Sequence, residues 1–214
     1  MTRKADEIAA HFARLATLEP ESIAVRFENR EYTWRNLGAI ADGIVAELDR
    51  AGVERYAAVG WLARNDPALI GALIGLIQGR HCVSPINPHQ PPAKSAEQLR
   101  MLNMAALVGV EQDFKPEVRA ALEDIGAIGL VLEAGASVPV RRLDPAAKLG
   151  SGPFRNLGDD IVIERLTSGT TGEPKRIQVP AETFSKAVEL GARSEKDGPK
   201  GELKVKRSPS ILQT

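Results

Sequence analysis

The sequence predicts an α/β fold, a largely parallel sheet flanked by helices. Between residues 57 and 132, short segments rich in Val, Ile, Leu and Ala alternate with longer segments of helical periodicity. Parallel strands need crossover connections, which are usually helices, so this alternation is typical of a parallel sheet covered on both faces. The composition agrees, because 43% hydrophobic and 26% charged residues in a chain of 214 allow a packed core.

The residues before this alternation form a group of their own. A helix is expected around Phe12, and residues 22–27 alternate polar and apolar side chains as a strand does. Residues 30–32 can pair with that strand after a turn that contains asparagine. Thr33 is then expected to cap a helix whose apolar stripe runs to Gly52, a residue suited to end it.

The alternation itself gives the main strands and helices. Strands are expected at residues 57–62, 82–86, 105–110 and 127–132, and helices from Pro67 and over residues 95–104 and 116–125. The most apolar run, Ala68 to Gln78, is about half the ~20 residues that a membrane-spanning helix needs. Its glycines repeat every four residues and share one helix face, so this helix is expected to lie flat against the sheet.

The remaining third of the chain is less regular. Residues 133–160 are rich in Gly and Pro and are expected to be a linker or a surface excursion. The elements expected after it are strands at residues 160–166 and 176–179, a helix at 181–192, a solvated charged loop at 193–207 and a strand at 210–213.

Composition excludes several classes of function. With 28 basic and 28 acidic residues the formal net charge is zero, so the sequence lacks the electrostatic signature of a nucleic-acid-binding protein. The single cysteine, Cys82, cannot form an internal disulfide, and the three histidines show no zinc-type spacing. The N-terminus resembles no signal peptide. These features favour a soluble, cytoplasmic protein without a membrane span.

The segment from Thr167 to Lys175 carries the strongest chemical signal. It reads TSGTTGEPK and places four hydroxyls, two glycines and a lysine directly after an expected buried strand. Glycines let backbone N–H groups approach an anion, hydroxyls donate further hydrogen bonds, and an ammonium balances phosphate charge. A phosphate-binding loop is therefore expected, although an ordinary polar hairpin connection has a similar composition. It is not a Walker A loop, because Glu173 and Pro174 separate Gly172 from Lys175.

The string LTSGTTGEPK resembles the phosphate-binding signature of the adenylate-forming (AMP-binding) enzymes, a family that includes acyl- and aryl-CoA synthetases, peptide-synthetase adenylation domains and luciferases. Residues 30–48 and 52–88 are similar to the family's early turn and helix and to its block of strand, Asn-containing turn and helix. Arg176 departs from the pattern, because a small residue is common there.

The resemblance implies the N-terminal part of the family's large domain. Members are more than twice as long, and their adenine, ribose, magnesium and catalytic-lysine motifs lie downstream of the loop. We therefore expect residues 1–165 to form one α/β subdomain. Residues 166–214 are expected to hold the phosphate-binding loop and the following strand, helix and charged loop, as the truncated start of the next subdomain.

The implied function is that of an ATP-dependent carboxylate-adenylating enzyme, most simply an acid–CoA ligase acting on a fatty or aromatic acid, with ATP, Mg²⁺ and coenzyme A as cofactors. The chain alone is expected to be inactive, and to self-associate or to lack its C-terminal portion. Three alternatives stay open: an acyl-AMP ligase that serves a carrier protein, a non-catalytic nucleotide- or phosphate-binding module, and a subunit of a split ligase.

Specific roles follow from the same resemblance. The residues expected to bind the β- and γ-phosphates of ATP are Thr167, Ser168, Gly169, Thr170, Thr171, Gly172 and Lys175. Thr170 or Thr171 is also expected to face the magnesium ion. No catalytic residue is identified.

Other chemically notable residues have simpler interpretations. His81 and Cys82 lie in or beside an expected buried strand without an acid or amide partner, so core packing is favoured over a nucleophile. Trp34 and Trp61 sit among apolar residues and are expected to pack rather than to line a ligand site. His89 is expected to be a solvated loop residue.

Overall fold

The computed structural model describes residues 4–133, 139–167 and 175–197. The helices are α1 (Lys4–Leu18), α2 (Trp34–Ala51), α3 (Pro67–Gln78), α4 (Pro92–Leu102), a 3₁₀ turn η1 (Glu111–Asp113), α5 (Pro116–Ile125) and α6 (Ala181–Asp197). The strands are β1 (Ile23–Phe27), β2 (Arg30–Thr33), β3 (Ala58–Leu62), β4 (Cys82–Ile86), β5 (Ala106–Val110), β6 (Ile128–Leu132), β7 (Val140–Arg142), β8 (Ile161–Leu166) and β9 (Arg176–Pro180).

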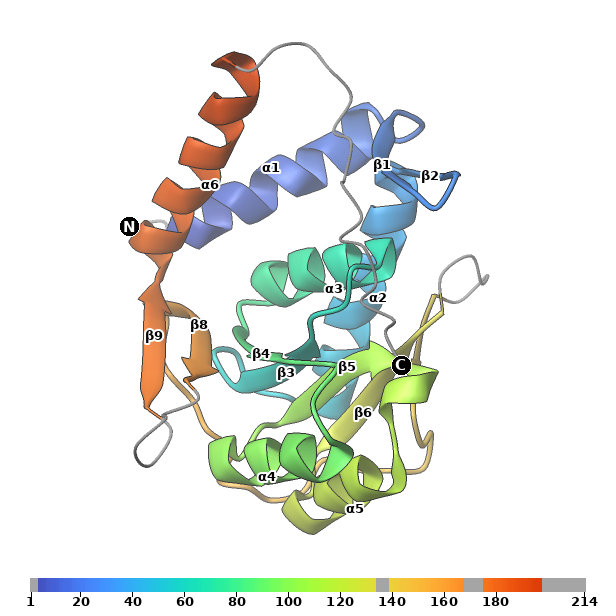
Figure 1. The fold of residues 1–214 in the computed structure, drawn as a ribbon, viewed down its shortest axis with the longest axis vertical. Coiled ribbons are helices and arrows are strands. Elements are labelled where there is room, and N and C mark those ends of the chain that lie inside the picture. Colours follow the sequence, from blue (N-terminus) through green and yellow to red (C-terminus); the bar gives the residue numbers. More distant parts are fainter. Residues whose placement is uncertain (1–3, 134–138, 168–174, 198–214) are drawn as a thin grey trace, which may run out of the picture.

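A seven-stranded sheet with the order β7-β6-β5-β3-β4-β8-β9 forms the centre of the molecule (Figure 1). The five inner strands pair in parallel, and the edge strands β7 and β9 pair antiparallel with β6 and β8. Helices α2 and α3 cover one face, and α4 and α5 cover the other. The predicted α/β class with a largely parallel sheet is confirmed.

Two apolar cores lie on the two faces of this sheet. On one face, Ile44 of α2 and Leu76 of α3 pack against strand residues such as Val83. On the other, Leu99 of α4 and Leu122 of α5 pack against the opposite strand faces. Because both faces are covered, the central strands β3, β5 and β6 are apolar along their whole length, which is why their continuous apolar runs could be predicted.

The glycine face of α3 lies against α2 rather than against the sheet, so that detail of the prediction was wrong. A Cβ atom at Gly75 would lie 2.6 Å from the carbonyl oxygen of Ala41, and one at Gly71 would lie 2.9 Å from the Cβ of Ile40. The apolar residues of α3 surround most of its circumference, so hydrophobicity alone did not distinguish the sheet-facing side from the side that touches α2.

Capping residues set most helix boundaries where the sequence placed them. Thr33 forms a capping box with Asn36 at the start of α2, and Gly52 ends that helix in the left-handed conformation, with φ of 77°. Asp66 caps α3, with Pro67 in the first turn. Three boundaries differ: α4 begins earlier than predicted, at Pro92, and ends earlier, at Leu102, and α6 continues to Asp197 into the segment expected to be a charged loop.

The predicted hairpin near the N-terminus is present as a separate two-stranded sheet, β1–β2. Its turn residues, Glu28 and Asn29, have φ angles of 49° and 62°. Two consecutive left-handed residues match the twist of a two-residue hairpin. The strand expected at residues 210–213 lies outside the described residues.

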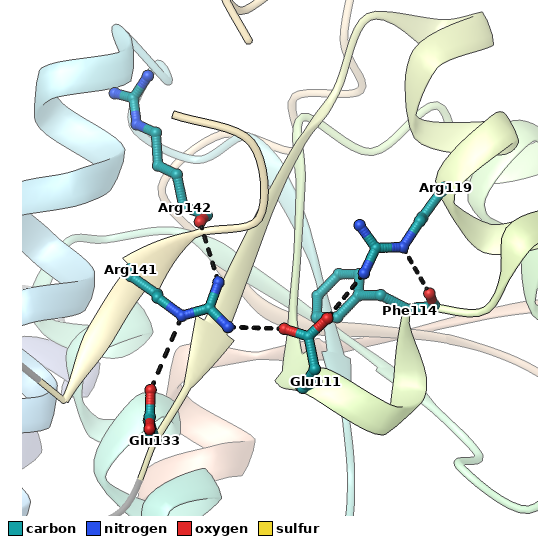
Figure 2. Close-up of polar contacts among 6 residues, drawn as sticks. All are labelled: Glu111, Phe114, Arg119, Glu133, Arg141 and Arg142. Carbon is teal, nitrogen blue, oxygen red and sulfur yellow. Dashed lines mark hydrogen bonds and ion pairs between the residues drawn. The ribbon is translucent and has the colours of Figure 1, made fainter. Parts of the chain in front are cut away.

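The segment expected to be a linker or a surface excursion contributes the short edge strand β7, and a network of ion pairs surrounds it (Figure 2). Glu111 accepts hydrogen bonds from Arg141 of β7 at 2.7 Å and from Arg119 of α5 at 2.8 Å. The hydrogen bond from Arg141, together with the charges of both arginines, lowers the pKa of Glu111. Arg142 also bonds Glu47 of α2 at 3.0 Å, and Val140 is buried in the core on the α2 side of the sheet, so ion pairs and apolar burial together hold this strand.

Among the described helices, none has the length and apolar character needed to cross a membrane.

Candidate functional site at the carboxyl edge of the sheet

The chain changes direction within the sheet at β3. From β3 it runs to β4 on one side, and it then crosses to β5 on the other side, so helices α3 and α4 lie on opposite faces. In open α/β sheets, ligands bind outside the carboxyl ends of the strands at such a switch point. The topology therefore directs attention to the carboxyl ends of β3 and β4, and of β8 beside β4.

A cavity of about 870 Å³ lies at this place. Its lining comes from the segments that follow β3, β4 and β8 and from one side of α4. The lining residues are Ala63, Asn65, Pro85, Ile86, Asn87, Pro88, His89, Gln90, Lys94, Glu97, Gln98, Met101, Arg165, Leu166 and Thr167.

The lining offers mainly neutral hydrogen-bonding groups and two cations. Gln90 donates to Ser95 Oγ at 3.0 Å and to Gln98 Oε1 at 3.2 Å, which fixes its amide beside α4. Lys94 and Arg165 supply positive charge, and Glu97 is the one carboxylate among the described lining residues. This balance suits a polar or anionic group more than an extended apolar chain.

The predicted phosphate-binding segment begins at this cavity with Thr167, and its last residue, Lys175, contacts Thr167. Antiparallel pairing of β8 and β9 brings Thr167 and Lys175 together: the Thr167 backbone N–H donates to the Lys175 carbonyl oxygen at 2.9 Å, and the Thr167 hydroxyl donates to the same oxygen at 3.3 Å. The other predicted site residues, Ser168, Gly169, Thr170, Thr171 and Gly172, lie outside the described residues.

Arg176, the residue that follows the segment, contacts α4. Its guanidinium donates to the carbonyl oxygen of Met101, at the end of α4, at 3.2 Å. This contact connects the start of β9 to the helix that lines the cavity.

A buried carboxylate that was not predicted from the sequence lies in β8, shortly before the loop. Glu164 of β8 is 0% exposed, and its carboxylate accepts two hydrogen bonds of 2.5 Å from Arg155 and one of 3.2 Å from Gln178. Burial by itself raises the pKa of Glu164, but the hydrogen bonds from Arg155 and Gln178 outweigh it, and the pKa lies below its ordinary value. The sequence signal that could have revealed this site was a single acidic residue on the apolar face of the predicted strand.

Two asparagines of the cavity lining were not predicted from the sequence. Asn65 and Asn87 each follow a buried strand closely, and both line the cavity. The sequence analysis predicted neither asparagine as a site residue. Their shared position became visible once the parallel pairing of β3 and β4 was known.

Four other residues behave as their simpler interpretations predicted. His81 and Cys82 are both buried, as core packing predicts. Trp61 donates its indole N–H to the Leu69 carbonyl oxygen at 3.0 Å, as a packing residue does. His89 is exposed, as expected, but it also lines the cavity.

The described residues do not by themselves build a magnesium site. Within residues 4–133, 139–167 and 175–197, no three His, Cys, Asp or Glu side chains gather as metal ligands would. Mg²⁺ is usually held by carboxylates, phosphate oxygens and water, and Glu97 alone does not make such a set. The prediction for Thr170 concerns a residue outside the described part.

The fold and the cavity at the switch point define a class, the α/β proteins that bind their ligand at the carboxyl edge of the sheet. Residues 12–203 match the family described as AMP-binding enzyme. The chain therefore belongs to the AMP-binding enzyme family, and the resemblance found in the sequence is confirmed.

Relatives by sequence are large synthetases. The chain is 27% identical to pyochelin synthetase PchF of Pseudomonas aeruginosa over 175 residues, which cover 82% of this chain and 9% of PchF. It is 28% identical to the AMB antimetabolite synthetase AmbB of the same organism over 168 residues, which cover 78% of this chain and 12% of AmbB. The chain thus spans a small part of the length of these relatives.

Similar solved structures confirm the fold. Apo MatB from Rhodopseudomonas palustris superimposes with a TM-score of 0.65 at 15% identity, covering 88% of this chain and 38% of MatB. The anthranilate CoA ligase AuaEII in complex with anthranoyl-AMP gives a TM-score of 0.64 at 19% identity, covering 87% of this chain and 36% of AuaEII.

Proposed function

We propose that this chain holds the outer phosphates of ATP in a carboxylate-adenylating enzyme. The observation that carries the proposal is the β8–β9 hairpin, which places Thr167 and Lys175 in hydrogen-bonding contact beside the cavity at the carboxyl edge. Thr167, Ser168, Gly169, Thr170, Thr171 and Gly172 would donate hydrogen bonds to the β- and γ-phosphates, and Lys175 would be their counter-charge.

These contacts would assist the reaction in a definite way. A carboxylate oxygen attacks the α-phosphorus of ATP, the bond from that phosphorus to the bridging oxygen of the β-phosphate breaks, and pyrophosphate leaves. Attack by an anion on a polyanion meets like-charge repulsion, so donors that hold the departing pyrophosphate lower the barrier. Mg²⁺, with Thr170 or Thr171 facing it, would add positive charge when bound with the nucleotide.

The acceptor of the acyl group is a finer part of the proposal. We propose an acid–CoA ligase, in which coenzyme A takes the acyl group from the adenylate. The likeness in fold to the anthranilate CoA ligase supports this choice. The synthetases PchF and AmbB support the alternative, an acyl-AMP ligase that serves a carrier protein, because they match this sequence at 27% and 28% identity.

Two non-catalytic alternatives remain. One is a stand-alone phosphate- or nucleotide-binding module, and the other is a subunit of a split ligase, which would co-purify with a second chain. For an active assembly, the acid is a small carboxylate, and acid-dependent release of pyrophosphate from ATP distinguishes a ligase from a binding module.

Calorimetric titration of the chain with Mg–ATP, Mg–pyrophosphate and AMP tests the central proposal. The outer-phosphate assignment predicts that ATP and pyrophosphate bind and that AMP, which lacks both outer phosphates, binds much more weakly. Binding of AMP as tight as that of ATP would refute it.

A further inference from the structure

Strand β9 has little buried surface to fix its register against β8. It lies at the edge of the sheet and pairs only with β8 among the described strands. Its residues Arg176, Ile177 and Gln178 are exposed, and none of its side chains is fully buried. Where one face of a strand is buried, burial specifies the register, because a slip by one residue turns every side chain to the other face. On β9 this constraint is weak.

A polar contact supplies the missing constraint. Glu164 and Gln178 are direct cross-strand partners in the β8–β9 ladder, and the Gln178 amide donates to Glu164 Oε1 at 3.2 Å. A slip of β9 by one residue would place Ile177 or Val179 opposite the buried carboxylate. Such a slip would leave one acceptor of a fully buried charge without its partner, which is costly.

Glu164 is itself fixed by a rigid neighbour. Arg155 bonds both carboxylate oxygens of Glu164 at 2.5 Å, in the bidentate geometry that gives an ion pair its directional specificity. The backbone of Arg155 is anchored as well: its carbonyl oxygen accepts from Ala58 N of β3 at 2.8 Å, and its N–H donates to the Asn103 carbonyl oxygen at 3.0 Å. The carboxylate therefore has a defined position relative to the central sheet.

We propose that Glu164, held by Arg155, is a positioning residue that fixes the register of β9 through Gln178 and thereby sets how Lys175 faces Thr167. The register decides which backbone atoms meet at the base of the hairpin, and in the observed register these are Thr167 N–H and the Lys175 carbonyl oxygen. The consequence for phosphate binding rests on the proposed function of Thr167 and Lys175. The consequence for the register of β9 does not depend on that proposed function.

The test uses a pair of matched variants on adjacent positions of β9. Gln178→Met keeps an unbranched side chain of similar length but removes the donor to Glu164. Ile177→Met places the same residue type on the neighbouring exposed position, outside the network. Both leave the Arg155–Glu164 ion pair intact, so the sheet is expected to fold in both.

The first measurement is amide hydrogen exchange by NMR in the full chain, with the Thr167 amide compared with that of Val83 in the central strand β4. Gln178→Met should speed exchange at Thr167 by about tenfold relative to Val83, as expected for loss of a hydrogen bond to a charged group. Ile177→Met should leave the ratio unchanged. A purely structural role would move both amides together. An unchanged ratio in Gln178→Met, or an equal change in both variants, would overturn the proposal.

A third variant adds a pH readout. In Gln178→Glu the new carboxylate repels Glu164 at neutral pH, so the exchange ratio should rise there. As the pH falls and the new carboxyl gains a proton, it can donate to Glu164 and the ratio should return toward that of the wild type. A ratio without this pH dependence would contradict the direct contact.

The second measurement is the affinity of each protein for Mg–pyrophosphate. Gln178→Met is expected to bind pyrophosphate about threefold more weakly, the size of one cross-strand pair, with Ile177→Met unchanged. An altered exchange ratio with unaltered affinity would overturn the positioning role. If the wild type binds no pyrophosphate, the proposed function fails, and the exchange ratio alone decides the register.

Discussion

The backbone N–H of Thr167 donates a 2.9 Å hydrogen bond to the carbonyl oxygen of Lys175. Eight positions separate these residues along the chain, yet the β8–β9 ladder brings their backbones together at the carboxyl edge of the sheet. The lysine at the end of the segment is thereby returned to the strand end from which the segment leaves. This hydrogen bond keeps the first and last residues of the predicted phosphate-binding segment next to each other. The first prediction concerns the last of them, Lys175.

Replacement of Lys175 by alanine should weaken binding of ATP and pyrophosphate more than binding of AMP. The lost contact is charge-assisted and should cost about 1.5–3 kcal/mol of binding free energy for ligands that carry the outer phosphates. Titration calorimetry on the chain, or on a longer protein that contains it, measures the three affinities. Lys148→Ala removes an exposed lysine that follows Ala147, whose carbonyl oxygen accepts a hydrogen bond from Arg142 of the opposite edge strand β7, and it serves as the control. Equal weakening of ATP and AMP by Lys175→Ala would count against the outer-phosphate assignment.

The elements that could be predicted are those whose periodicity and end signals agree. Cys82–Ile86 and Pro116–Ile125 were predicted to the residue, since each has a clear apolar pattern bounded by Gly, Pro or a polar residue. β7 was not, because its contacts are made with distant parts of the chain: Arg141 and Arg142 reach acidic partners, and Val140 joins the core with α2. The division of the chain between residues 165 and 166 stays a prediction.

The candidate site shows the same contrast. The motif beginning at Thr167 was visible because its composition is local. Its neighbours Asn65, Asn87 and Arg165 come together only through parallel pairing of β3, β4 and β8, and no spacing in the sequence encodes that pairing. The partner of Glu164 was hidden in the same way, since Arg155 lies in the Gly- and Pro-rich segment expected to be a linker or a surface excursion.

Protonation of His81 should lower the free energy of unfolding as the pH falls. Its ring is 1% exposed, and burial lowers its pKa from 6.5 to about 4, with Asp49 only partly offsetting that effect. The unfolded chain therefore binds a proton more readily than the folded chain does. The contribution to stability is complete above pH 6.5 and is lost as the pH falls from there toward about 4, by roughly 3 kcal/mol in total.

Urea denaturation at a series of pH values tests this effect. His81→Phe removes the titrating group and keeps an apolar ring in the buried position, so the fall between pH 7 and pH 5 should flatten. His89→Ala, at an exposed histidine, should keep the slope of the wild type. An unchanged slope in His81→Phe would show that other groups cause the dependence.

Gly75→Ala should destabilise the contact between α3 and α2. A Cβ atom there would lie 2.6 Å from the Ala41 carbonyl oxygen, and this is a backbone atom that cannot move without shifting α2. Overpacking typically costs about 1–3 kcal/mol, and the better helix propensity of alanine returns at most about 1 kcal/mol. A net loss of about 1 kcal/mol or more in the free energy of unfolding is expected from urea denaturation.

Gly38→Ala is the matched control for that variant. Its Cβ would meet the Ala16 side chain at 3.1 Å, and α1 can adjust by a few tenths of an ångström. We expect a smaller loss, or none. If Gly75→Ala proved as stable as the wild type, the close approach of the two helices would not be a constraint on this position.

The last prediction is that this chain alone does not adenylate any acid. Catalysis requires groups that stabilise the α-phosphorus and the attacking carboxylate in the transition state, and proper orientation of the two reactants supplies much of the rate. The proposed contacts of Thr167 to Gly172 and Lys175 serve the outer phosphates only, and the described residues gather no metal-binding carboxylates. The chain should therefore bind ATP or pyrophosphate without turnover. The measurement is acid-dependent exchange of labelled pyrophosphate into ATP by the purified chain, across a panel of fatty and aromatic acids. Robust exchange that Lys175→Ala abolishes would show that these 214 residues contain a complete catalytic site.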